Sequence, residues 1–247
     1  KNILPGVDLT EGKFVIGLDK DKISVVGPAK LNGVAATIDW KKPRNGGEAR
    51  VAVETTLTEK MREKLGIKLD AYMSGDVPVK LAIENVTKEK RSIAVEADLS
   101  EVSMKVAAAG WSRPATKNTV ATFNFLEDKE TGRSIEDLKI DGKGLRLRGN
   151  IRLSSSNALR VIDFKEVRLS EDDVFAIRME PSEGATKLSI SGNSFDARPY
   201  IKNLVSPDKA AAGSDGPKGG DFVVAASFKN VTAHRGENVR NVSGTFM

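Results

Sequence analysis

Apolar and polar residues alternate along most of the chain, the pattern of β-strands that bury one face and leave the other in water. Three segments, which start near residues 77, 93 and 102, show it most clearly. Their apolar positions are Val77, Val79, Leu81, Ile83, Ile93, Val95, Leu99, Val102, Met104 and Val106. Similar segments recur from KFVIGLD at 13–19 to FVVAASFKNV at 222–231. The sequence therefore predicts a mainly β fold with a sheet that is apolar on one side.

The links between these segments are short and rich in turn-forming residues. LDKDK, NVTKEK, EDKETG and PSEG carry the Asp, Asn, Gly and Ser residues that tight antiparallel connections use. We expect a largely antiparallel sheet in which strands follow one another, so that an open sheet can grow by adding strands. The same alternation also fits a closed sandwich, in which a second layer seals the apolar face.

Two segments depart from the alternation and predict short helices near 58–65 and 196–205. LTEKMREKLGI places Thr58 as the N-cap and Gly66 at the end of the first helix. FDARPYIKNLV places Asp196 as the N-cap of the second, with a proline in its first turn. Both helices interrupt the β pattern without replacing it.

The chain divides into three parts by composition. Residues 1–205 form the β unit that contains both expected helices. Residues 206–220, SPDKAAAGSDGPKGG, have the composition of a flexible linker or loop. Residues 221–247 read as the start of a following β repeat that is cut off. Since both ends resemble the middle of a domain, we expect a piece of a longer protein.

The charge is mildly basic and evenly mixed. The formal net charge of +5 comes from 39 basic and 34 acidic residues, which predicts a solvated surface of interleaved signs. Proteins that bind single-stranded nucleic acid stack its bases on aromatic side chains set among basic ones. RLRGNIRL brings Arg146, Arg148 and Arg152 together with no aromatic residue between them. We therefore expect no nucleic-acid partner.

Residues for catalysis or metal binding are scarce. The chain has no cysteine and a single histidine, His234, in the turn-like stretch VTAHRGEN. The usual acyl-transfer sets, which need a Ser or Cys beside a His, find no match. Glu171, Asp172 and Asp173 are interpreted as a solvated hairpin turn. We predict no catalytic residue, no metal site, no cofactor and no enzyme activity.

Both tryptophans of the chain occur in similar phrases, IDWKKP and AGWSRP. In each, the tryptophan is followed by a polar, a basic and a proline residue. We interpret them as one structural corner used twice, in which the indole covers the rim of the sheet and proline stops further pairing. The rim residues are Trp40, Lys42, Trp111 and Arg113. A basic rim also suits lipid phosphates.

Longer phrases carry a resemblance to a known family. DLKIDGKGLRLRGNIRL, RVIDFKEVRLSEDDVFAIRM, KLSISGNSFDARPYI and ASFKNVTAHRGENVRNVSG are similar to recurring segments of the AsmA-like superfamily, and within it of the YhdP-type large envelope proteins. The most distinctive is the phrase in which a strand runs into Phe195, Asp196, a basic residue and Pro199. The resemblance extends over most of residues 1–205. None of these motifs is a catalytic signature.

This resemblance implies an elongated, strongly curved β-sheet whose concave side is an apolar groove. It also implies a periplasmic location, an inner-membrane anchor elsewhere in the same long chain, and phospholipid as the partner. On that reading the fragment is non-enzymatic and binds or conducts acyl chains between the inner and outer membranes, and the ten apolar positions named first line its groove. The alternative is a structural or interaction module of the cell envelope that binds protein or glycan.

Overall fold

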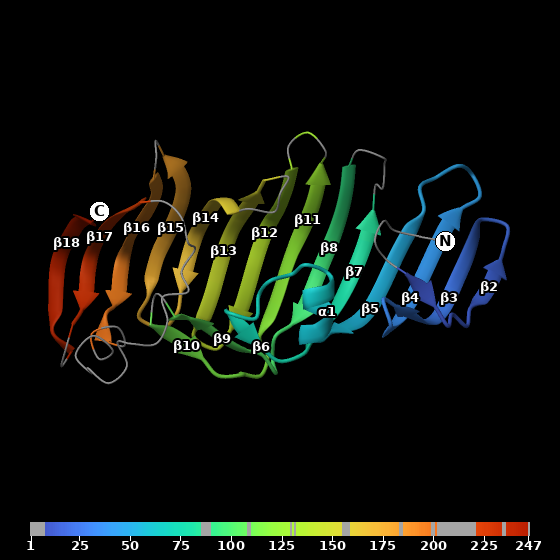
Figure 1. Ribbon diagram of the computed structural model, residues 1–247, viewed down its shortest axis with the longest axis horizontal. Coiled ribbons are helices and arrows are strands. Elements are labelled where there is room, and N and C mark those ends of the chain that lie inside the picture. The colour runs from blue at the N-terminus through green and yellow to red at the C-terminus, as the bar shows by residue number, and fades with distance from the viewer. Residues whose placement is uncertain are drawn as a thin grey trace.

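The computed structural model describes residues 8–84, 90–107, 110–128, 130, 132–154, 159–182, 185–198, 201, 221–233 and 236–246. Most of this part of the chain belongs to one 15-stranded sheet (Figure 1). Its strands are β1 (Leu9–Thr10), β2 (Val15–Leu18), β3 (Lys22–Leu31), β4 (Val34–Pro43), β5 (Arg50–Leu57), β7 (Val77–Glu84), β8 (Lys90–Asp98), β11 (Val120–Asp128), β12 (Gly132–Gly142), β13 (Leu145–Leu153), β14 (Leu159–Arg168), β15 (Val174–Ser182), β16 (Ala185–Asp196), β17 (Asp221–Thr232) and β18 (Asn238–Phe246). The mainly β prediction is confirmed.

Strands that follow one another in the chain also lie side by side in the sheet. From β3 to β16 every neighbouring pair is antiparallel, whereas β16 and β17 are parallel. A parallel pair needs a crossover connection, because the chain must return to the starting end of the first strand. The segment that makes it includes the expected linker at 206–220, which lies outside the described residues. β17 and β18 extend the same sheet, and whether 221–247 begins a repeat stays a prediction.

Two excursions from the sheet meet and form a small cover over its central strands. The first, between β5 and β7, contains α1 (Glu59–Lys64) and β6 (Met73–Ser74). The second, between β8 and β11, contains β9 (Ser103–Val106) and β10 (Trp111–Arg113). β9 pairs with both β6 and β10, so the excursions share a three-stranded sheet. We call α1 and these three strands the cap; it lies in front of the large sheet in Figure 1.

The helix of the cap starts where its sequence predicts. Thr58 precedes α1, and its hydroxyl accepts the amide of Met61 at 3.3 Å. The second expected helix, at 196–205, falls mostly outside the described residues. Within them, Asp196 is the last residue of β16, and its carboxylate accepts the amide of Arg198 at 3.0 Å. The amide of Ile201 donates to the carbonyl of Ala197 at 2.9 Å, the spacing of an α-helical hydrogen bond, and the helix over 196–205 stays a prediction.

Buried apolar residues gather in two clusters on one face of the sheet. The first lies under the cap and joins β7, β8 and β11 to Val102, which is 0% exposed. The second lies on β14–β17, where Phe175, Phe195 and Phe228 contact one another with ring centroids 5.0–6.0 Å apart. Val167, 1% exposed, belongs to this second cluster. Burial of this kind is the main stabilising contribution to the fold.

Candidate functional site

A row of apolar side chains crosses the large sheet from one end to the other. Each residue faces the next one on the neighbouring strand, so the row follows the register of strand pairing. We call it the apolar stripe. Its members are Ile16, Val25, Trp40, Val51, Ile83, Ile93, Phe125, Ile135, Ile151, Ile162, Met179, Leu188, Val224 and Phe246. At about 4.8 Å between strands, a row over about a dozen strands is on the order of 60 Å long.

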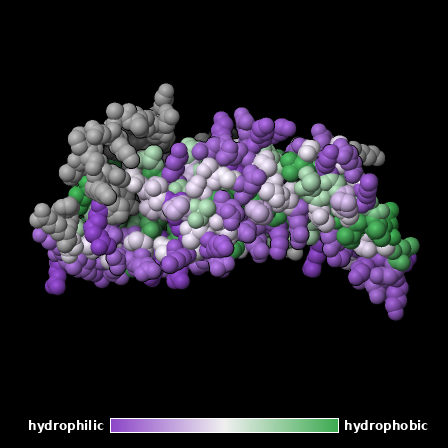
Figure 2. All heavy atoms as spheres, turned by 90° about the horizontal axis from the view of Figure 1, so that it is seen from below, coloured by the Kyte–Doolittle hydropathy of each residue, from purple (hydrophilic) through white to green (hydrophobic). Residues whose placement is uncertain are grey.

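Most of the stripe keeps part of its surface accessible. From Val25 to Val224, every member except Ile83 is half-buried, and Ile83 is 2% exposed. At the two ends of the sheet, Ile16 and Phe246 are largely exposed. Figure 2 shows the first of these ends, on the right, as a gathering of apolar residues. Closed protein cores bury such side chains almost fully, so most of the stripe is an accessible part of the apolar face, together with half-buried residues of the next row such as Leu81 and Val95.

A parallel row on the same face, four or five residues from the stripe along most strands, is much better covered. We call it the inner row, and it lies toward the cap. Its members are Ala29, Ala36, Val79, Ala97, Ala121, Ile140, Leu147, Val167, Phe175 and Phe228. These residues are buried except Ile140 and Leu147, which are half-buried; Thr55 on β5 and Gly192 on β16 continue the row and are half-buried as well. The apolar face is therefore closed along one side and accessible along the other.

The structure places some of the ten predicted groove residues on the accessible part of the apolar face and the others under or in the cap. Leu81, Ile93 and Val95 are half-buried, and Ile83 and Ile93 are neighbours on the stripe. The alternation predicted for their strands matches the burial of β7 and β8, in which Lys80 and its neighbours of the same parity are exposed. Leu81, Ile93 and Val95 remain candidates for contact with a ligand, whereas Ile83 is buried.

The other predicted groove residues lie under or in the cap. Val77, Val79, Leu99 and Val102 are buried in the first apolar cluster, and Met104 packs against it. Val106 faces Trp111 within the cap and is 38% exposed. The segment 102–106 thus covers the large sheet instead of extending it. Sequence alternation could not reveal this, because a strand of the cover and a strand of the sheet have the same period.

The opposite face of the large sheet is charged. Glu54, Lys80 and Glu96 face one another across β5, β7 and β8, and the Lys80 ammonium lies 3.6 Å from the Glu96 carboxylate. Three hollows of the described chain lie on this polar face, among them one floored by Ala52 and Ala82. The two faces therefore offer different chemistry, an aliphatic stripe on one and alternating charges on the other.

The two tryptophan phrases do not form the same corner. Trp40 lies within β4, where it is a half-buried member of the stripe between Val25 and Val51. Lys42 lies on the same face, two residues further along, and is exposed beside Ile23. Pro43 is the last residue of β4, so this proline ends a strand as expected. Lys42 is the one residue of the phrase placed at the accessible side of the apolar face.

Trp111 and Arg113 belong to the cap and not to the large sheet. Trp111 begins β10, half-buried, and Pro114 follows the strand. The Arg113 guanidinium donates to the Thr119 hydroxyl at 3.2 Å and to the Lys143 carbonyl at 3.1 Å. Its burial lowers the pKa of the guanidinium below the ordinary arginine value. Arg113 therefore ties β10 to the β12–β13 turn, which is a structural role.

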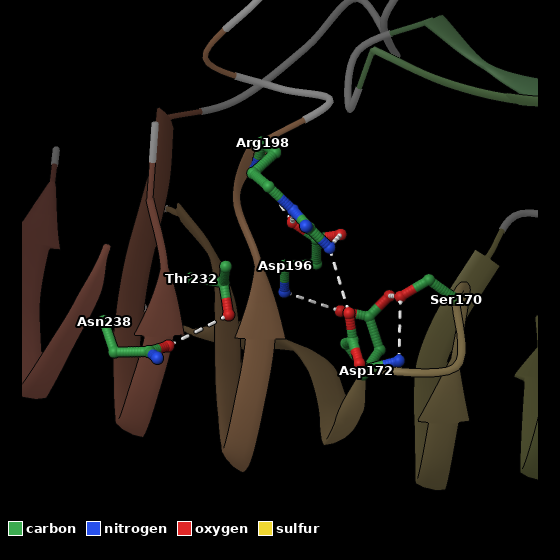
Figure 3. A network of polar contacts seen from close by, with 7 residues as sticks. Ser170, Asp172, Asp196, Arg198, Thr232 and Asn238 are labelled. Atoms are coloured by element: carbon green, nitrogen blue, oxygen red, sulfur yellow. Dashed lines mark hydrogen bonds and ion pairs between the residues drawn. The ribbon is translucent and has the colours of Figure 1, made fainter. Parts of the chain in front are cut away.

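The acidic turn before β15 is partly buried, which corrects its interpretation as a solvated hairpin turn. Glu171 and Asp172 are exposed, but Asp173 is 2% exposed. The Asp173 carboxylate accepts the Ser170 hydroxyl at 2.9 Å and the Asp196 amide at 2.8 Å. These bonds hold the end of β16 against the β14–β15 turn (Figure 3).

The distinctive FDARP phrase completes the same polar network. The Arg198 guanidinium donates to both oxygens of Asp196, at 2.7 and 2.8 Å, and reaches Asp172 at 2.9 Å (Figure 3). The hydrogen bond and charge of Arg198 lower the pKa of Asp196, and the carboxylates raise the pKa of Arg198. The ion pair and hydrogen bonds between Asp196 and Arg198 therefore hold the backbone in place where it leaves β16.

A charged cluster on the apolar face was missed by the sequence analysis. Arg91, Glu127 and Arg133 are cross-strand neighbours on β8, β11 and β12. Each lies two residues from a stripe residue along its own strand, on the same face and at the accessible side. The turns were predicted at NVTKEK and EDKETG, the second of which contains Glu127, and Arg91 and Arg133 directly follow them, so the three residues were not predicted as neighbours on strands. Counting two positions on from Ile93 and Phe125 would have placed Arg91 and Glu127 on the apolar face.

A buried arginine in the cap was missed as well. Arg62 is 1% exposed, and its guanidinium donates to the carbonyls of Leu57 and Gly75 at 3.1 and 2.9 Å. It also reaches Asp70 at 3.3 Å. These contacts join the end of β5, helix α1 and the start of β7. In the sequence Arg62 follows Met61 in a charged helix and has the pattern of a solvated residue.

Comparison with models of protein families, with curated proteins and with solved structures finds no match for this chain. Across the described ranges, no group of three or more His, Cys, Asp or Glu is placed to hold a metal ion. Within the same ranges, no helix has the length and apolar character needed to span a membrane. The arrangement that stands out is the accessible apolar stripe, which is bordered by charged side chains on β8, β11 and β12.

Proposed function

We propose that the apolar face of this sheet is a groove that binds the acyl chains of phospholipid. The chain acts without enzymatic chemistry as a segment of an AsmA-like, YhdP-type envelope protein. It lies in the periplasm, and an inner-membrane anchor elsewhere in the long chain holds it there. The strong curvature that this family resemblance implies is part of the proposal. Its function is to bind or conduct lipid between the inner and outer membranes.

The observation that carries the proposal is the unbroken apolar stripe. It crosses every strand of the large sheet except β1, and between Val25 and Val224 it has no polar member. A stabilising core does not need such a row to remain half-buried. An acyl chain in water costs about 0.8 kcal/mol per methylene, or on the order of 10 kcal/mol for a whole tail. A continuous aliphatic surface removes most of that cost.

The dimensions also suit lipid. One leaflet holds roughly 15 Å of hydrocarbon, so three or four strands at about 4.8 Å spacing present a wall of matching length. The stripe is several times longer, which allows several tails to lie in file. Aliphatic residues outnumber aromatic ones in it, with Trp40, Phe125 and Phe246 as the aromatic members. A smooth aliphatic wall lets a tail slide, since no polar contact has to break.

The alternative is an interaction module that binds protein or glycan, and one observation favours it. The hollows described above lie on the polar face, where Glu54, Lys80 and Glu96 supply hydrogen-bonding groups. Polar and charged groups of this kind suit glycan hydroxyls or a charged protein surface. The two functions therefore use opposite faces and can be told apart by position.

Site-specific photo-crosslinking in cells tests the two faces directly. A photoreactive residue is placed at Ile93 and Ile151 on the stripe, at Val102 in the buried cluster, and at Lys80 on the polar face. We expect phospholipid adducts from the two stripe positions and none from Val102 or Lys80. Protein or glycan adducts from Lys80, with no lipid from Ile93 and Ile151, would replace the lipid proposal by the interaction module.

Native mass spectrometry of the gently purified protein gives an independent measure. The lipid proposal predicts retained phospholipid that is lost when Ile151 is replaced by a charged residue. A protein that purifies without lipid and does not take it up from detergent-solubilised phospholipid contradicts the proposal.

A further inference from the structure

Two arginines share one glutamate at the accessible side of the apolar face. The Arg91 guanidinium lies 3.4 Å from one Glu127 carboxylate oxygen, and the Arg133 guanidinium lies 2.6 Å from the other. A second nitrogen of Arg133 donates to the same carboxylate at 2.8 Å. The three side chains are 23–34% exposed, so the cluster is partly desolvated but open to a ligand. We call it the arginine pair.

The arginine pair borders the stripe on three adjacent strands. Ile93, Phe125 and Ile135 are cross-strand partners on the stripe. Arg91, Glu127 and Arg133 each lie two residues away from one of them along the strand, on the same face. On these three strands charged groups therefore begin where the stripe ends, whereas the same row continues with Leu153 and Leu159 on β13 and β14. The spatial order on the sheet, an apolar surface and then cations, matches the order of groups in a phospholipid, in which the tails are followed by the phosphate.

The three side chains of the cluster carry an excess of positive formal charge, which attracts an anion. Two guanidinium groups and one carboxylate sum to +1. A phosphate diester carries one negative charge and accepts paired N–H bonds from guanidinium groups, the geometry that arginine fits better than lysine. Partial desolvation strengthens such bonds relative to bulk water.

We propose that Arg91 and Arg133 bind the phosphate of a phospholipid whose acyl chains lie on the neighbouring part of the apolar stripe. Glu127 pairs with both guanidinium groups and lowers the net positive charge that they present to the phosphate. This inference rests on the proposed lipid function and adds the residues that recognise the headgroup. It also fixes the orientation of the bound lipid. The phosphate lies at the accessible side of β8, β11 and β12, and the tails extend from there over the stripe in the direction of the cap.

The chain supplies a matched control on its polar face. Arg146 and Arg148 flank Asp141, at 3.6 and 2.7 Å, in a similar arrangement of two arginines around one carboxylate. No stripe residue lies beside them on that face, and Glu166 adds a second carboxylate 3.7 Å from Arg146. Replacing this pair changes the charge of the protein by the same amount as replacing the arginine pair.

The test compares two lipids with identical tails, phosphatidylglycerol and diacylglycerol, which differ in the phosphate. Binding to the whole chain is measured by native mass spectrometry in detergent, with fluorescent analogues as a second readout. We expect wild type to prefer phosphatidylglycerol by about tenfold, the effect of one charge-assisted contact. Arg91→Gln with Arg133→Gln should remove this preference and leave diacylglycerol binding unchanged. Arg146→Gln with Arg148→Gln should leave the preference intact.

A third variant, which keeps both arginines, distinguishes the loss of headgroup binding from misfolding of the double mutant. Glu127→Gln keeps both arginines and raises the charge of the cluster, so it should increase the preference for phosphatidylglycerol. A purely structural ion cluster predicts instead a lower melting temperature and an unchanged lipid preference in Glu127→Gln. Equal binding of the two lipids by wild type, or an equal loss in the polar-face control, overturns the proposal.

Two further outcomes distinguish lipid phosphate from free phosphate, and failure of the headgroup site from failure of the proposed lipid function. Inorganic phosphate at millimolar concentration should not displace phosphatidylglycerol, because it lacks tails; displacement would assign the site to free phosphate and overturn the lipid assignment. Failure of the proposed function appears differently, as the absence of both diacylglycerol and phosphatidylglycerol binding. Diacylglycerol binding without a phosphate preference rejects the headgroup site alone.

Discussion

The apolar face of this sheet has two sides that share composition and differ in cover. Under the cap, Val77, Leu99 and Val102 are buried in a closed cluster. Along the stripe, equally apolar residues such as Ile93 and Ile151 keep part of their surface accessible. The difference comes from the two excursions that meet through β6 and β9, not from the strands themselves. Local hydrophobicity therefore does not distinguish a core from a binding surface; the cover does.

A buried charge gives the largest expected contrast between the two sides. Val102→Asp places an unpaired carboxylate at a fully buried position, which should lower the free energy of unfolding by on the order of 4 kcal/mol. Ile151→Asp places the same group on the half-buried stripe, where water can reach it, and should cost about 1–2 kcal/mol. Denaturant titrations of both variants measure the difference.

Equal losses in these two variants would mean that the stripe is as closed as the cap cluster. That result would remove the physical basis for a groove. Val102→Ala is the control for side-chain size, since it removes two carbons without adding charge. It should cost about 1–2 kcal/mol.

The cap itself depends on Arg62, and its removal gives the next effect in size. Arg62→Met leaves the carbonyls of Leu57 and Gly75 without their side-chain donor, which should cost about 2–3 kcal/mol. Hydrogen exchange should show the loss mainly in α1 and β6, with the stripe strands β13–β15 protected as before. Arg62→Lys keeps the charge but not the planar fork, so it should recover only part of the loss. Uniform loss of protection over the whole sheet would show that the cap is not a separate unit.

The strands of the large sheet could be predicted from the sequence more completely than the cap that covers them. The period-two pattern predicts β7 and β8 and the face each residue occupies, because a strand places alternate side chains on opposite sides. It also predicts the N-cap of α1, since Thr58 meets a local requirement for an amide acceptor. Both depend on residues close together in the chain.

Contacts between distant segments were not predictable in the same way. The pairing of β6 with β9 joins Met73 to Met104, and no local pattern indicates it. The arginine pair likewise requires the registers of β8, β11 and β12 together. Asp173 has the sequence context of a solvated turn and is buried because the distant Asp196 amide needs an acceptor. In each case the decisive partner is more than twenty residues away or on another strand pair.

Acidification should weaken the end of β16, with a smaller effect. Arg198 lowers the folded-state pKa of Asp196 below its ordinary value near 4. A depressed carboxyl pKa contributes stability that is complete above the ordinary value and is lost as the pH falls through the folded pKa. Melting temperatures between pH 6 and pH 2 should therefore fall more in wild type than in Arg198→Gln. A parallel fall in both proteins would mean that the pair contributes nothing to the acid response.

The smallest effect on stability is expected for a substitution on the polar face. It tests most strictly whether lipid binds to the apolar face alone. The Lys80–Glu96 pair is exposed on both sides, and such pairs contribute about 0–0.5 kcal/mol in water. Lys80→Gln should therefore leave the free energy of unfolding within about 0.5 kcal/mol of wild type. It should also leave retained phospholipid unchanged in native mass spectrometry, because its side chain points away from the stripe. If Lys80→Gln depleted lipid as strongly as Ile151→Asp, lipid would be bound through the charged face, and the uneven cover of the apolar face would be a feature of stability alone.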